Sequence, residues 1–184
     1  MFFLSGEIKA TEPIRFGIIA GINYSKFTSL LISNKIGFHA GLKTEYHFSP
    51  TAKGVYVDAA ALISLKGGKF EGWEGLSSKY NPYYLEVPIH IGYKLALNDK
   101  LSILGNFGPY FGYGLMGKVV ESDGGSTNSY DIFSDDYFNT RFDYGLGIRI
   151  GVEMMKKIQV TAGYDLGLDQ IENKNLTLSV AYMF

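Results

Sequence analysis

The chain has 184 residues, the length of one domain, and its 17 Lys and Arg nearly balance its 18 Asp and Glu. A net charge of −1 excludes a broad basic surface for nucleic acid, and the absence of Cys excludes disulfides, thiolate metal sites and Cys nucleophiles. No stretch approaches the roughly 20 apolar residues of a membrane-spanning helix. Only 19% of residues are charged, and the 23 Gly, 13 Phe and 14 Tyr favour an all-β protein with aromatic faces.

Alternation of apolar and polar residues predicts eight strands, because a helix with its period of 3.6 cannot place the two sets on opposite faces. The alternation is clearest in Lys35–Phe48 and weakest in Phe16–Tyr24, where Ile18 and Ile19 are adjacent. In chain order the expected strands are Phe16–Tyr24, Lys35–Phe48, Val55–Lys66, Tyr83–Lys94, Leu101–Leu115, Phe138–Ile150, Lys157–Leu166 and Asn175–Phe184.

The connections alternate in length, which is typical of an antiparallel up-and-down meander. Short turns are expected at Ser49–Lys53, Ala96–Lys100 and Val152–Lys156. The connections of the other end are Lys26–Asn34, Gly67–Pro82, Lys118–Asp136 and the shorter Asp169–Lys174. We therefore expect an eight-stranded antiparallel up-and-down β-barrel over residues 15–184, preceded by an N-terminal extension or residual signal region at 1–14.

The apolar face of such a barrel points either outward to lipid or inward to a ligand, as in a soluble lipocalin-like carrier. The polar face is rich in Gly, Ser, Asn and Tyr, and the strands have the length that crosses a bilayer, so the sequence favours lipid. Aromatic residues also form two expected interface belts. The belt residues are Tyr46, Phe48, Tyr93, Tyr182 and Phe184 at the turn end, and Tyr83, Tyr113 and Phe138 at the loop end.

These features predict a transmembrane barrel in the outer membrane of a Gram-negative bacterium, with periplasmic termini and extracellular long loops. The segments FGIIAGINYSKF (Phe16–Phe27), YLEVPIHIGYKL (Tyr84–Leu95) and AGYDLGLDQI (Ala162–Ile171), with the terminal aromatic, resemble the PorT-like outer-membrane β-barrel domain family over Arg15–Phe184. The resemblance implies a small outer-membrane barrel without an assigned reaction. It leaves open an accessory role in secretion or assembly of outer-membrane proteins, because the founding member is linked to secretion.

Met1–Pro13 lacks the basic and apolar regions of a signal peptide, so we expect that signal to be removed or to start upstream.

The interior of an eight-stranded barrel is just wide enough for side chains to fill, so charges placed there have to be paired. The expected interior network is Lys43, Glu45, Asp58, Glu86, His90, Tyr110, Arg141, Asp143, Arg149 and Asp165, with Lys66 and Lys94 also pointing inward. Its default interpretation is a polar plug, and the alternative is a proton or ion relay.

The expected turns make specific neighbours in this interior. They place Lys43 near Asp58, Glu86 near Tyr110, and His90 near Asn106. The last short turn sets Asp143 opposite Asp165, with Arg141 as mediator. Pro88 cannot donate to a strand ladder, which predicts a bulge or break there.

No catalytic residue is expected, because no hydrolase, zinc-protease or nucleotide-binding motif occurs. His39 and His90 face inward on non-adjacent strands, so neither a metal site nor a cofactor is predicted. In Lys118–Asp136 the acidic residues suggest either Ca²⁺ binding or a solvated loop. Gly67–Pro82 carries loop contact candidates for a partner, or for packing over the barrel mouth: Phe70, Trp73 and Leu76.

The expected role is structural or surface-interacting through the loops. The expected partners are outer-membrane lipid, lipopolysaccharide and a surface or periplasmic protein, without nucleic acid.

Overall fold

The computed structural model describes residues 13–27, 35–49, 53–71, 76–123, 127–133, 141–168 and 173–184. These residues form ten strands. The strands are β1 (Ile14–Phe27), β2 (Lys35–His47), β3 (Gly54–Leu65), β4 (Gly68–Glu71), β5 (Leu76–Ala96), β6 (Leu101–Asp123), β7 (Thr127–Asp131), β8 (Phe142–Met154), β9 (Ile158–Gly167) and β10 (Asn173–Met183). Within the described residues, no helix is long and apolar enough to cross a membrane.

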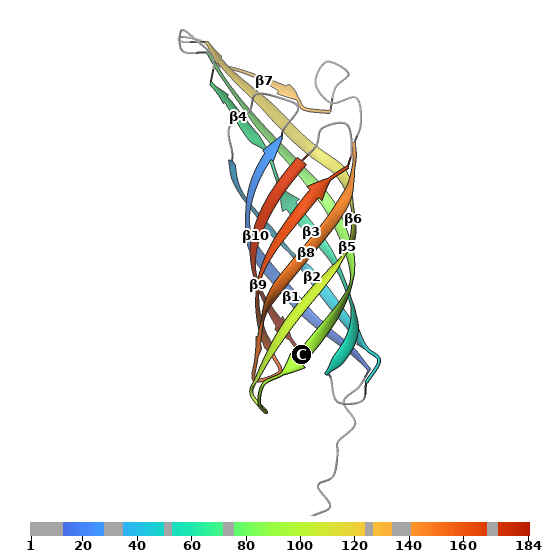
Figure 1. Cartoon of the computed structure of the whole chain (residues 1–184). Coiled ribbons are helices and arrows are strands. Elements are labelled where there is room, and N and C mark those ends of the chain that lie inside the picture. The colour runs from blue at the N-terminus through green and yellow to red at the C-terminus, as the bar shows by residue number, and fades with distance from the viewer. Residues whose placement is uncertain are drawn as a thin grey trace, which may run out of the picture.

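Eight of the ten strands close into a barrel. The order is β5-β3-β2-β1-β10-β9-β8-β6, with β4 and β7 added at its two ends, and an additional β5–β6 pairing closes the ring. Every pairing is antiparallel, including that between the first and last strands of the chain, β1 and β10. The expected eight-stranded up-and-down barrel is thus confirmed (Figure 1).

Two connections expected as loops contain strands instead. Strands β5 and β6 run for 21 and 23 residues, and the short strands β4 and β7 pair with their far ends. The result is a four-stranded sheet, β4-β5-β6-β7, that projects beyond the barrel at the end opposite the C-terminus (Figure 1). We call it the loop-end sheet. Gly67–Pro82 and Lys118–Asp136 were not predicted as strands because their few apolar residues do not alternate with polar ones; Val119 and Val120, for example, are adjacent.

The expected irregularity at Pro88 appears as a gap in the ladder. The β3–β5 pairs run from Ala59 with Ile89 to Leu62 with Glu86 and omit Val87 and Pro88, with the register unchanged. The bulge itself lies elsewhere, between Tyr83 and Tyr84, where β5 leaves the barrel for the loop-end sheet. A bulge bends a strand and sharpens its twist, which fits the change of direction at this point.

The turn between β8 and β9 lies about two residues later than expected. Met154 pairs with Ile158, and Met155 and Lys156 form the turn with positive φ values of 52° and 59°. Lys157 N–H donates to the Met154 carbonyl at 3.0 Å, so Met155 and Lys156 are the two central residues of a β-turn within a three-residue connection, Met155–Lys157. Positive φ usually calls for Asn or Gly, and neither occurs at these two positions. The sequence therefore gave no signal for the true register.

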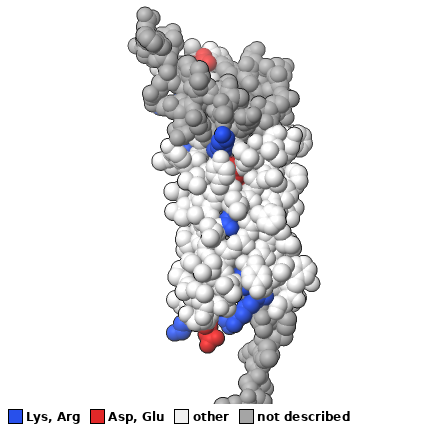
Figure 2. Space-filling model, viewed as in Figure 1, with Lys and Arg blue, Asp and Glu red and all other residues white. Residues whose placement is uncertain are grey.

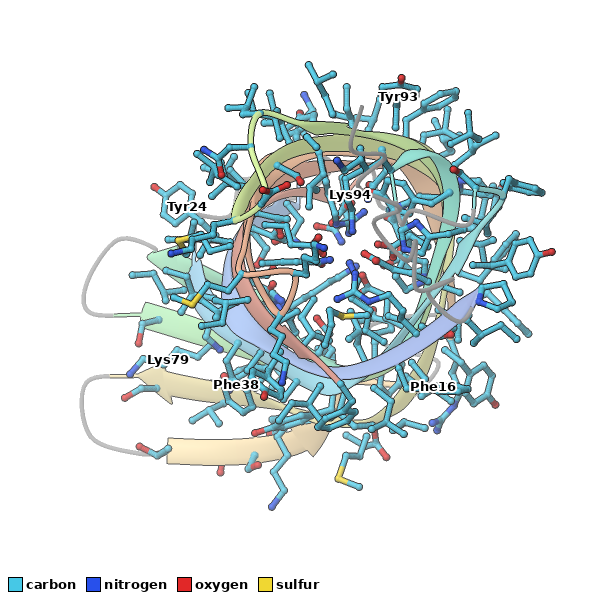
Figure 3. All side chains as sticks on the ribbon, turned by 90° about the horizontal axis from the view of Figure 1, so that it is seen from below. Phe16, Tyr24, Phe38, Lys79, Tyr93 and Lys94 are labelled. Atoms are coloured by element: carbon cyan, nitrogen blue, oxygen red, sulfur yellow. The ribbon has the colours of Figure 1, made fainter. Side chains whose placement is uncertain are left out.

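The apolar face of the barrel is its outside. Large apolar side chains such as Leu42 (67% exposed) and Ile148 (61% exposed) cover the wall, whereas the polar partners in the alternation are buried. In Figure 2 the wall of the barrel carries few charged side chains on the visible face. In the end-on view of Figure 3, Phe16 and Tyr93 point away from the barrel, and Lys94 points into it. The lipocalin-like carrier is therefore wrong, because its apolar face would point inward.

Candidate functional site in the barrel interior and at the loop end

Glu45 is the centre of a charged cluster in the turn-end half of the interior. Its side chain is fully buried, and its carboxylate lies 3.0 Å from Lys94 Nζ and 3.5 Å from both Lys43 Nζ and Arg15 Nη1. His47 Nε2 lies 3.1 Å from it. Several positive groups therefore surround this one carboxylate and offset the large cost of burying its charge.

Glu153 is the second acceptor of this cluster, and the sequence did not reveal it. Lys94 Nζ lies 2.7 Å and Arg15 Nη1 2.9 Å from its carboxylate, and Gln159 donates to both Glu45 and Glu153. Glu153 was placed in the turn because the turn was predicted two residues early. Arg15 stood at the boundary of the expected barrel, so its inward position was not recognised either.

Lys43 pairs with Asp58, as the first hairpin predicts. Asp58 lies directly opposite Glu45 in the ladder, and Lys43 contacts both carboxylates. Two like charges in this position would otherwise be destabilising. Asn106 donates to the Tyr56 hydroxyl at 3.1 Å, which links this pair to the next strand pair.

Asp143 and Asp165 do not face each other, which corrects the expected neighbours. The register places Asp165 opposite Gly147, and its partner is Arg149, with Nη2 at 3.0 Å. Arg149 Nη1 also lies 2.9 Å from both ring nitrogens of His90. Arg141 is no mediator, because its Nη1 donates to the Gly114 and Leu115 carbonyls at the barrel mouth.

Lys66 holds the loop-end half of the interior together. Its Nζ is 2.9 Å from both Glu86 and Asp143, and it lies 4.6 Å from the centre of the Tyr110 ring. Tyr110 in turn donates to Asp143 at 2.9 Å. Glu86 and Tyr110 thus meet at Lys66. Lys66 directly follows β3 and Asp143 lies on β8, and these two strands are not neighbours, so the positions of the hairpin turns could not predict this pair.

The histidines are engaged by polar neighbours rather than by each other. The ring nitrogens of His39 lie 2.7 Å from Asn23 Oδ1 and 2.9 Å from Ser179 Oγ. Among the described residues, no group of three or more His, Asp or Glu side chains could hold a metal ion.

The space between the charged clusters of the interior is small. The cavity between the charged clusters measures about 20 Å³, which is room for about one water molecule. Most residues of its walls are polar, and they include His39, Lys43, Asp58, Glu86 and Arg149. The barrel therefore has a closed, ion-paired interior without a continuous channel through the described residues.

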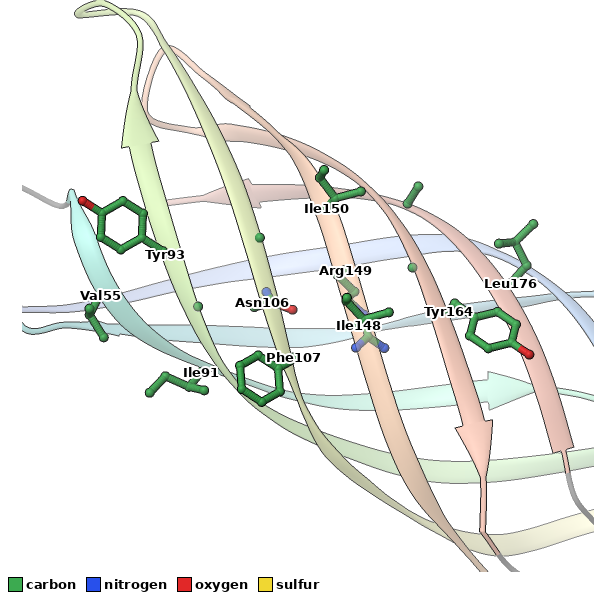
Figure 4. Close-up of a pocket in the computed structure, with 14 residues that line it drawn as sticks. Val55, Ile91, Tyr93, Asn106, Phe107, Ile148, Arg149, Ile150, Tyr164 and Leu176 are labelled. Carbon is green, nitrogen blue, oxygen red and sulfur yellow. The ribbon is translucent and has the colours of Figure 1, made fainter.

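A shallow apolar groove lies on the outside of the barrel wall. It has a volume of about 790 Å³, and its sides include Ile91, Phe107, Ile148 and Tyr164 (Figure 4). Ile91 pairs with Phe107, which pairs with Ile148, which pairs with Tyr164, so one row of cross-strand neighbours forms one border. Its position on the outer face makes it part of the surface that meets the surroundings of the barrel.

The described belt residues point outward at both ends. Tyr46, Phe48, Tyr93, Tyr113, Tyr182 and Phe184 are between 40% and 71% exposed, and Tyr83 is half-buried. Rings pair edge-to-face at both ends, as in Tyr182 with Phe184 and Tyr113 with Phe142. Phe138 and Trp73 lie outside the described residues, as do Asp135 and Asp136 of the suggested Ca²⁺ loop and the side chains of Phe70 and Leu76.

The loop-end sheet has a small apolar core of its own. Val119 and Ile132 are fully buried, and Tyr80 and Phe133 pack against them. Burial raises the pKa of the Tyr80 phenol, and the Glu121 carboxylate raises it further. Lys35 at the start of β2 donates to the Tyr80 carbonyl at 3.1 Å and to the Asn81 side chain, which ties this sheet to the barrel.

Several solved structures share this architecture. The chain is 19% identical to Ail, the attachment invasion locus protein of Yersinia pestis, in a complex with the heparin analogue sucrose octasulfate, with a TM-score of 0.50 over 93% of this chain and 99% of that one. It is 12% identical to Neisserial surface protein A, with a TM-score of 0.51 over 94% and 98%. It is also 12% identical to OprG of Pseudomonas aeruginosa, with a TM-score of 0.52 over 93% and 94%. No similar sequence was found among curated proteins.

At these identities the neighbours show the fold alone. They agree with the closed, antiparallel ring of eight strands described above. The sequence matches the outer membrane protein beta-barrel domain family over residues 9–173. The chain therefore belongs to this family and is an outer-membrane β-barrel of the Gram-negative type.

Proposed function

We propose that this protein is a closed, non-enzymatic barrel that displays the loop-end sheet outside the cell for contact with surface molecules. The observation that carries the proposal is the length of β5 and β6, which extend well beyond the barrel at the loop end only. A strand needs about 9–11 residues to cross a membrane, and these strands have 21 and 23. Roughly half of each is therefore available to build structure beyond the lipid.

The filled interior supports a role at the surface rather than in transport. The residues that would line a pore are instead ion-paired with one another, as with Lys66 between Glu86 and Asp143. The absence of an enzymatic role is supported by His39 and His90, which are buried inside the barrel. Ail, which has the same fold, was solved with a heparin analogue, an example of such a barrel with a ligand.

The proposed orientation has both termini in the periplasm. Strands β1 and β10 pair with each other, so the chain enters and leaves the barrel at the same end as the short turns. The narrower assignment to the PorT-like family is also a proposal. It is supported by the segment Tyr84–Leu95, which lies in β5.

Cysteine labelling in intact cells tests the orientation directly, because the chain has no Cys of its own. We expect Ser129→Cys, on exposed strand β7, to react with a membrane-impermeant maleimide. The matched variant Asp99→Cys, in the exposed β5–β6 turn, should react only after the outer membrane is permeabilised. Labelling of Asp99→Cys, and not of Ser129→Cys, in intact cells would contradict the proposal.

A further inference from the structure

One face of the loop-end sheet continues the lipid-facing wall of the barrel. Residues that pair across antiparallel strands point to the same face, so the register assigns this face. Lys79 pairs with Val120, which pairs with Ser129; Asn81 pairs with Lys118, which pairs with Asp131; and Tyr83 pairs with Met116. We call this set the lysine face: Lys79, Asn81, Tyr83, Met116, Lys118, Val120, Ser129 and Asp131.

The lysine face is hollowed. A pocket of about 570 Å³ lies where β5 and β6 leave the barrel and β7 pairs with β6, and seven residues of the lysine face line it, all except Lys79. The bulge between Tyr83 and Tyr84 bends the strands at the same point. Met116 is 66% exposed there, so an apolar side chain is presented next to polar ones.

The chemistry of the pocket changes along the strands. Tyr83 and Met116 form its apolar end, at the level of the expected outer aromatic belt. Lys118 lies two residues beyond Met116, which is about 7 Å further from the barrel at the rise of a strand. The headgroup layer on each side of a bilayer is about 5–8 Å thick. An apolar end at the lipid boundary and a cationic end at headgroup depth match an amphiphile that stands in the outer leaflet.

The charge of the cationic end favours a phosphate-bearing headgroup. Lys79 and Lys118 are both exposed, and each carries a positive charge. Asp131 is the acidic residue among the pocket walls. In Figure 3, Lys79 lies on the part of the sheet that extends beyond the barrel. Asn81, Ser129 and Asp131 add the amide, hydroxyl and carboxylate groups that hydrogen-bond to sugar hydroxyls.

The opposite face of the sheet keeps this surface in place. Val119 and Ile132 are buried there, and Tyr80 packs on them. Lys35 holds β5 in place beside the pocket, because it donates hydrogen bonds to the Tyr80 carbonyl and to the Asn81 side chain. The pocket therefore belongs to a packed sheet, so a ligand does not have to order it first, which reduces the entropic cost of binding.

From these observations we propose that the lysine face binds the phosphorylated sugar headgroup of an outer-leaflet glycolipid, with its acyl portion against Tyr83 and Met116 and its phosphate at Lys118 and Lys79. The site rests on the proposed function, because it needs the loop end to face the outer leaflet. The proposal specifies where on the chain such a lipid binds, and it distinguishes the lysine face from the largely apolar groove on the barrel wall.

Native mass spectrometry of the full chain in detergent micelles tests the site. The probes are bisphosphorylated lipid A, the same lipid without phosphates, and phosphatidylglycerol. The variant is Lys79→Gln with Lys118→Gln, and the matched control is Lys100→Gln with Lys157→Gln, two exposed lysines at the turn end. Heat-modifiable mobility on a gel confirms that each variant is folded.

We expect the Lys79 and Lys118 double variant to bind bisphosphorylated lipid A about 25-fold more weakly, at about fivefold per lysine. The turn-end control should bind like the parent, and the lipid without phosphates should bind weakly to all three. Equal binding by parent and double variant would overturn the proposal. So would equally tight binding of phosphatidylglycerol, or self-association of the chain that the same substitutions abolish. A negative result in this lipid-binding experiment would not change the result of the cysteine labelling, which tests the orientation separately.

Discussion

Glu45 is the residue on which the turn-end half of the interior most depends. Arg15, Lys43 and Lys94 all place a charged nitrogen within 3.5 Å of its carboxylate. Removing one partner of a buried charge network leaves the others without full compensation, at a cost of several kcal/mol.

We predict that Glu45→Gln lowers the free energy of unfolding by about 3 kcal/mol, because the amide keeps the shape and removes the charge. Urea unfolding in lipid vesicles measures the change. Asp99→Asn, in an exposed turn, is the control and should change stability by less than about 0.5 kcal/mol. Equal stability of the Glu45 variant and the parent would contradict the assigned role.

At the scale of elements, the β8–β9 turn contains residues that are unfavourable for its backbone geometry. Met155 and Lys156 both have positive φ, which costs non-glycine residues about 1–2 kcal/mol each. Arg15 hydrogen-bonds to the Lys156 carbonyl, and this contact uses only the backbone of the turn.

Replacing Met155 and Lys156 by Asn and Gly should therefore stabilise the protein by roughly 1–2 kcal/mol, because these residues adopt positive φ readily. The shift of the urea midpoint measures the gain. The double alanine variant should give no gain, since alanine has the same steric restriction. Stabilisation by both variants alike would show that the side chains, and not the backbone, set the cost.

The strands of the barrel were predictable because the alternation of apolar and polar residues fits only a strand, in which successive side chains point to opposite faces. In β2, side chains such as Phe38 and His39 must lie on opposite faces of a strand. The loop-end sheet was not predictable in this way, because β7 (Thr127–Asp131) is exposed throughout and shows no alternation. Within the interior, neighbours across one hairpin, such as Lys43 and Asp58, followed from the turn. Contacts across the barrel, such as Lys66 with Asp143, depend on closure, which sequence spacing does not encode.

For the whole molecule, the outward apolar face requires lipid rather than water around the barrel wall. Leu42 lies in the middle part of β2 and is 67% exposed. In water, an exposed Leu→Arg change is nearly neutral, whereas a cation on the lipid face of a barrel costs about 2–4 kcal/mol at the membrane centre.

We predict that Leu42→Arg destabilises the protein in lipid vesicles by about 2–4 kcal/mol, because the guanidinium would have to enter hydrocarbon. The control is Leu97→Arg, in the β5–β6 turn with 53% exposure, which should cost about 0–1 kcal/mol near the interface. Equal effects at the two positions, measured by urea unfolding, would argue against a lipid-facing wall at Leu42.

Recording of ion conductance across a planar lipid bilayer tests whether the ion-paired interior is closed. The cavity of about 20 Å³ between the charged clusters has room for about one water molecule, not for a file of hydrated ions. We predict that the purified full chain, inserted and verified by heat-modifiable mobility, produces no steady conductance. Stable open channels of reproducible conductance would contradict the account.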